Sequence, residues 1–166
     1  MALFLMAASV LQPVSLPALQ DEASAEPTSA VQISAVRVEP ANPAADTLCR
    51  LRIELENADE RIASQLGFTV TINGQELPVY KNHLFMFPVS PGGKSELPLY
   101  NFWSTETSRP LPASGKLEIE VALREARWMD ISTEDDTEVW KPLGDVTGLP
   151  VSRSITLEMA KGDSAD

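Results

Sequence analysis

The chain has 166 residues, of which 43% are hydrophobic, and this length and composition suit one folded domain with tails. Its 13 lysines and arginines stand against 24 aspartates and glutamates, so the net charge at pH 7 is −11. This balance argues against nucleic acid or an anionic membrane surface as a partner, because both attract cationic proteins. The single cysteine, Cys49, excludes a disulfide within the chain, and we expect its side chain to be buried.

The first 25 residues have features of an export signal rather than of a folded element. Residues 2–11 form an apolar run that is shorter than the roughly 20 residues a membrane span needs. Ala23-Ser24-Ala25 matches a small-x-small cleavage site, although no lysine or arginine precedes Arg37, and a disordered tail is the competing interpretation. We expect a signal peptide at 1–25, a linker at 26–30, and a periplasmic or extracellular protein that is not inserted in the membrane once the signal is removed.

Alternating apolar and polar residues predict strands through the rest of the chain, because successive side chains of a strand point to opposite faces. In the first predicted strand, residues 31–39, the apolar parity changes between Ile33 and Val36, which indicates a bulge. The clearest strand is residues 48–56. Its predicted buried face is Cys49, Leu51, Ile53 and Leu55, and its predicted solvent face, suited to ion pairs between strands, is Arg50, Arg52, Glu54 and Glu56.

Residues 65–72 and 75–80 are predicted to pair as a hairpin about Asn73-Gly74, because a type I′ turn needs positive φ at both central positions. Pro78 indicates that the return strand lies at a sheet edge. An apolar run at 84–89, a turn at 91–94 and strands at 96–103, 116–124 and 151–159 follow. The stretch 125–150 has no predicted strand, and 161–166 is a polar tail.

Seven or eight short strands without sustained helical periodicity predict an all-β fold, an antiparallel β-sandwich over residues 31–160. The order of the pieces resembles a bacterial immunoglobulin-like module of the CARDB (cell-adhesion-related) type. The resemblance is carried by Val36-Arg-Val-Glu-Pro, residues 48–58, Phe68-Thr-Val-Thr-Ile-Asn-Gly, Pro91-Gly-Gly-Lys and Ser114-Gly-Lys-Leu-Glu-Ile-Glu-Val. It implies an immunoglobulin-like sandwich on an exported or envelope protein, without catalysis and without shared functional residues. Residues 125–150 depart from the pattern as an insertion before the last strand.

This insertion contains the candidate metal ligands, five carboxylates close together in the sequence: Asp130, Glu134, Asp135, Asp136 and Glu138. Oxygen-rich clusters bind Ca²⁺, but the spacing is not that of an EF-hand, because Asp135 stands where the invariant glycine is needed. A solvated charged loop, a Ca²⁺ site and the centre of a small metal-dependent hydrolase at 130–138 are the three alternatives.

Trp128 and Trp140 flank the acidic stretch and are candidates for a binding surface or for anchors that fold the stretch onto the domain. The only histidine, His83, has no cysteine or histidine at ligand spacing, and no G-x-S-x-G motif is present. We therefore predict no enzyme and no cofactor other than the Ca²⁺ alternative. The expected function is that of an exported non-catalytic module for binding or envelope structure, with a protein or envelope component as partner.

Overall fold

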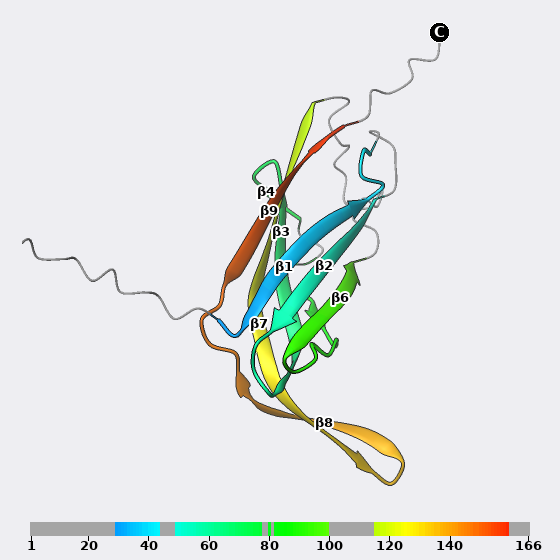
Figure 1. Cartoon of the computed structure of the whole chain (residues 1–166), viewed down its shortest axis with the longest axis vertical. Coiled ribbons are helices and arrows are strands. Elements are labelled where there is room, and N and C mark those ends of the chain that lie inside the picture. The colour runs from blue at the N-terminus through cyan, green and yellow to red at the C-terminus, as the bar shows by residue number, and fades with distance from the viewer. Residues whose placement is uncertain (1–28, 44–48, 78–79, 81, 100–114, 160–166) are drawn as a thin grey trace, which may run out of the picture.

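The computed structural model describes residues 29–43, 49–77, 80, 82–99 and 115–159, and this part of the chain forms nine strands in two antiparallel sheets (Figure 1). The predicted signal peptide, most of the linker and the polar tail lie outside the described residues. Within the described ranges, no helix is long and apolar enough to cross a membrane.

The two sheets group the strands as an immunoglobulin sandwich does. The smaller sheet has the order β1 (Val31–Glu39), β2 (Arg50–Asn57) and β6 (Gly93–Leu99). The larger sheet has the order β4 (Gln75–Glu76), β3 (Ile62–Ile72), β7 (Lys116–Glu134) and β8 (Thr137–Asp145), with β5 (Leu84–Phe85) on β3 and β9 (Val151–Glu158) on β7. These groups match the A-B-E and C-F-G strands of immunoglobulin domains. The predicted fold class is therefore confirmed, with one strand more than expected.

One hydrophobic core draws its buried side chains from strands of both sheets. Figure 1 shows the two sheets as two layers, with β1, β2 and β6 in one of them. All four side chains predicted for the buried face of residues 48–56 are fully buried, and so are Leu117, Ile119, Val121 and Leu123 of β7. Among the residues that the structure describes, the largest fully buried side chain is Phe68, on the strand that matches strand C. Burial raises the pKa of the Cys49 thiol to about 11, so that this cysteine is an inert core residue.

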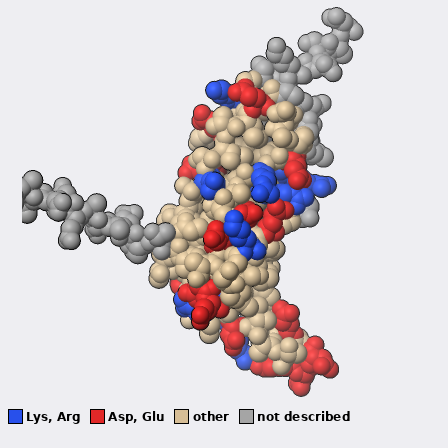
Figure 2. Space-filling model, viewed as in Figure 1, with Lys and Arg blue, Asp and Glu red and all other residues tan. Residues whose placement is uncertain are grey.

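Ion pairs between strands cover the outer face of the smaller sheet, as predicted. Arg52 lies 2.8 Å from carboxylate oxygens of both Glu39 and Glu96, and the Lys94 amine lies 3.0 Å from Glu54. The hydroxyl of Ser34 donates to Glu54 at 2.6 Å, and this bond, followed by the one from Lys94, lowers the pKa of Glu54. Figure 2 shows the two signs side by side on this face, which therefore offers no patch of a single charge.

The structure confirms the predicted bulge in β1 and the predicted turn at Asn73-Gly74. The β1–β2 register shifts between Ile33 and Ala35, which is the predicted bulge. The Asn73-Gly74 turn has φ values of 47° and 75°, and it brings Gln75 opposite Ile72. The return strand β4 is shorter than predicted, and the apolar run at 84–89 contributes only β5 and one further bridge from Val89 to Ala63.

The stretch 125–150 is the main correction, because most of it is paired strand and not an irregular insertion. β7 continues to Glu134, and β8 returns beside it. The β-branched and aromatic side chains of Ile131, Val139 and Trp140 suit extended backbone. At the end of the hairpin, Asp135 and Asp136 have φ values of 48° and 58°, the pattern of a type I′ turn.

Candidate functional site

The distal half of the β7–β8 hairpin projects beyond the sandwich, and residues 130–141 are called the arm from here on (Figure 1, yellow and orange). Its register pairs Asp130 with Lys141, Ile131 with Trp140, Ser132 with Val139, Thr133 with Glu138 and Glu134 with Thr137. The pairing of β3 with β7 ends at Ile62 and Met129, just before the arm. Within the described residues the arm is therefore a two-stranded ribbon that no third strand joins.

The base of the arm is fixed to the sandwich through Trp128 and Arg61. Trp128 is only 5% exposed, and the guanidinium carbon of Arg61 lies 4.2 Å from the centroid of its ring. Arg61 in turn donates two side-chain hydrogen bonds of 2.8 Å to the carboxylate of Asp59. These bonds, together with the backbone N–H of Arg61, hold the pKa of Asp59 far below its usual range.

The connection between β2 and β3 is shaped by Asn57, which is buried. Its side-chain amide donates to the carbonyl oxygen of Arg61 at 2.7 Å, and its Oδ1 accepts the N–H of Asp59 at 3.0 Å. This short turn places the Arg61 guanidinium over Trp128. In the sequence, Asn57 and Asp59 only follow the strand predicted at 48–56, and the polar run Asn-Ala-Asp-Glu-Arg is the available indication of a structured turn.

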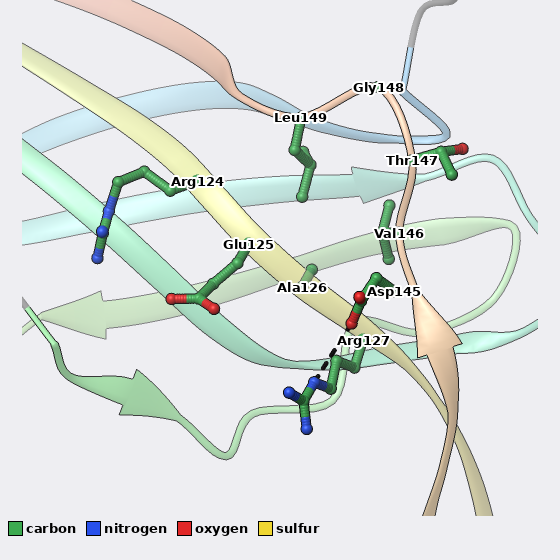
Figure 3. Close-up of a pocket in the computed structure, with 9 residues that line it drawn as sticks. All are labelled: Arg124, Glu125, Ala126, Arg127, Asp145, Val146, Thr147, Gly148 and Leu149. Atoms are coloured by element: carbon green, nitrogen blue, oxygen red, sulfur yellow. Dashed lines mark ion pairs between the residues drawn. The ribbon is translucent and has the colours of Figure 1, made fainter.

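A hollow of about 440 Å³ lies beside the base of the arm, between β7 and residues 145–149 (Figure 3). The N–H of Val146 donates to the carbonyl of Ala126 at 2.9 Å, and this bond holds residues 145–149 against β7 along the hollow. On its rim, Arg127 lies 3.4 Å from Asp145 and also donates to Gln65 at 3.2 Å. The lining contains no carboxylate of the arm, so the cleft that a hydrolase centre at 130–138 would need is not formed by this hollow.

The five candidate metal ligands are spread over the arm and do not converge. Asp130 and Glu134 share one face with Lys141, and Glu134 forms a 2.6 Å ion pair with that lysine. Glu138 lies on the other face, where it accepts the indole N–H of Trp140. The two remaining candidates, Asp135 and Asp136, occupy the turn.

In the part of the chain that the structure describes, no group of three or more histidine, cysteine, aspartate and glutamate side chains is arranged to hold a metal ion. The reason lies in the hairpin geometry, since successive side chains of a strand diverge to opposite faces. The carboxylates that are close together in the sequence are thereby separated in space.

The two candidate tryptophans have different roles. Trp128 is 5% exposed and belongs to the core at the base of the arm. Trp140 is half-buried on the arm opposite Ile131, and it does not fold the arm back onto the sandwich as one of the alternatives expected. Near it, Leu143 is 59% exposed at the bulge that follows Pro142. A half-buried aromatic side chain and an exposed apolar one thus lie near the carboxylates of the hairpin.

Comparisons with known proteins add no assignment to this geometry. No protein-family model matches the chain, and no curated protein matches it.

Proposed function

We propose that this chain is an exported, non-catalytic immunoglobulin-like module of the CARDB kind, and that it binds a protein of the cell envelope through its arm. In immunoglobulin domains the B–C and F–G connections cluster at one end of the sandwich, where variable domains bind antigen. Here the β2–β3 connection and the β7–β8 hairpin occupy these places, and the contact of Arg61 with Trp128 joins them.

The projection of the arm is the observation that carries this proposal. A two-stranded hairpin alone is only marginally stable in water. A ribbon that projects beyond its sheet is therefore stabilised most when another surface packs against it. The arm presents Ile131 and Trp140 half-exposed beside each other, and tryptophan is among the side chains enriched at the centres of protein interfaces. Figure 2 shows carboxylates concentrated on the projecting end, which suits a charged rim around these apolar groups.

Site-specific photo-crosslinking in intact cells of the native host tests the proposal. A benzophenone amino acid at Thr137, which is exposed on the arm, is expected to give one discrete protein adduct. The matched control is the same amino acid at Thr156, an exposed position on β9, which is expected to give none. Equal adduct patterns from the two positions, or no adduct from Thr137, would contradict binding through the arm.

The export part of the proposal has its own test, because the predicted signal lies outside the described residues. Intact-mass measurement of the protein from its native host is expected to show a mature chain that begins near residue 26, or near residue 19 if cleavage follows Ala18, the earlier small residue that could end the signal. A soluble cytoplasmic chain that keeps residues 1–25 would contradict export while leaving the arm proposal untouched.

A further inference from the structure

We infer that the arm binds its partner by strand addition: residues 130–134 of β7 pair with an extended partner segment in which basic and apolar residues alternate. This inference rests on the proposed function, and it adds the binding mode and the chemistry of the partner. It follows from three features of the arm: the strand edge at which a partner can pair, the side chains on its two faces, and its negative charge, which opposes pairing with a second copy of the chain.

The two edges of the arm differ in their ability to accept a strand. Just beyond the arm, the β8 edge carries Pro142, which lacks a backbone N–H, and the register shift between Trp128 and Met129 puts a bulge beside it. Prolines and bulges are devices by which edge strands avoid pairing. The β7 edge has neither from 130 to 134, and in the described residues β3 stops covering it at Met129. An added strand on β7 would therefore continue in the place that β3 leaves, whereas one on β8 would meet Pro142 and the bulge at the base of the arm.

The two faces of the β7 edge are complemented by different kinds of side chain on an added strand. Asp130 and Glu134 point to one face, and Ile131 points to the other, where Trp140 lies opposite it. Cross-strand neighbours stabilise a sheet when their charges are opposite or when both are apolar. A segment with lysine or arginine at every second position and apolar residues between them satisfies both faces at once.

A second copy of this chain fits the β7 edge poorly. Two arms side by side would bring Asp130 and Glu134 of one copy against carboxylates of the other, and like charges directly opposite destabilise a sheet. The arm has Lys141 as its single cation against five carboxylates, and the whole chain has a net charge of −11. This charge pattern favours a basic partner over self-association.

The test uses the full chain and fluorescently labelled seven-residue probe peptides, with anisotropy as the readout at about 0.1 M salt. The alternating probe is Lys-Val-Lys-Val-Lys-Val-Lys, and the shuffled probe Lys-Lys-Lys-Lys-Val-Val-Val has the same charge without the alternation. We expect the alternating probe to bind at least about tenfold more tightly, because only it matches both faces of the strand. Equal affinity for the two probes would overturn strand addition.

Variants locate the binding edge. Asp130→Lys together with Glu134→Lys is expected to weaken binding of the alternating probe at least about tenfold. The matched control, Glu118→Lys with Glu120→Lys, changes two exposed carboxylates of the same strand outside the arm, and it is expected to stay within about twofold. The isosteric pair Asp130→Asn and Glu134→Gln keeps the shape of the arm and is expected to weaken binding as well. A control pair that weakens binding as much as the arm pair would contradict the proposed edge.

Amide hydrogen exchange reports the pairing directly. Binding of the alternating probe is expected to slow exchange within residues 130–134, and to leave the β8 edge unchanged. Dimerisation of the free chain through the arm would overturn the inference in favour of a second copy. If crosslinking from Thr137 succeeds and the probe does not bind, this inference fails and the proposed function stands; if both fail, the proposed function fails with it.

Discussion

The guanidinium carbon of Arg61 lies 4.2 Å from the ring centroid of Trp128, and this contact joins the β2–β3 connection to the base of the arm. Asp59 orients the guanidinium with two hydrogen bonds, and the Trp128 ring is 5% exposed beneath it. A ribbon that projects into solvent keeps its direction only if its base is held. We infer that this contact, together with the core packing of Trp128, sets the direction of the arm.

Replacing Arg61 is therefore expected to loosen the arm. Arg61→Gln removes both the cation above the indole ring and the double hydrogen bond to Asp59, so amide exchange at Trp128 and Met129 should become faster. The control Arg124→Gln removes an exposed arginine from β7, the strand of Trp128 and Met129, and it should leave amide exchange at those two residues unchanged. Identical exchange in the two variants would show that core packing alone holds the base.

Asp59 gives the base of the arm a defined dependence on pH. Hydrogen bonds from Arg61 lower the pKa of this carboxyl in the folded state. The stability that the ionised carboxylate adds to the folded state is therefore fully present above the unfolded pKa of about 3.9. It is lost as the pH falls from there toward the folded pKa. Wild type should thus be more stable than Asp59→Asn at neutral pH, and the gap in urea melts should shrink below about pH 4. A gap that is constant between pH 7 and pH 3 would contradict this role.

The assignment of β2 side chains to a buried face and an outer face can be tested with two neighbouring substitutions. Ile53 is fully buried, so Ile53→Asp places an unpaired carboxyl in the core and should cost roughly 4 kcal/mol or more, enough to unfold many domains. Glu54→Lys acts on the outer face, where it disrupts ion pairs with Lys94 and Arg37 near solvent, and it should cause a much smaller loss. Thermal melts that show equal damage would invalidate the assigned faces.

Calcium distinguishes a charged arm from a metal site. Because the carboxylates of the arm diverge, millimolar Ca²⁺ should change the melting temperature no more than ordinary screening does, and added monovalent salt should have the same effect. A site occupied at one hundred times its dissociation constant would add roughly 2.7 kcal/mol, which a melt resolves. A calcium-specific rise that disappears in Asp135→Asn with Asp136→Asn would show that the turn gathers ligands after all.

The sequence alone determined the strands whose alternation is unbroken. Residues 49–55 and 117–123 keep a strict period of two, and both sets of apolar side chains are buried as expected. Local turn chemistry was equally informative, since Asn73-Gly74 forms the predicted hairpin. The reason is that these features depend only on neighbouring residues, through side-chain parity and the φ values that each residue tolerates.

Tertiary structure alone decided what happens after Leu123. The buried positions change parity there, from Leu123 to Ala126 and Trp128, because irregular pairing with β3 near Gly67 shifts the register. In the sequence this break is typical of a strand end, and the acidic Asp135-Asp136 turn lacks the glycine that marks a hairpin. The contact of Arg61 with Trp128 is equally tertiary: the two residues lie far apart in the chain, and they meet because β3 pairs with β7, with Ala63 opposite Trp128.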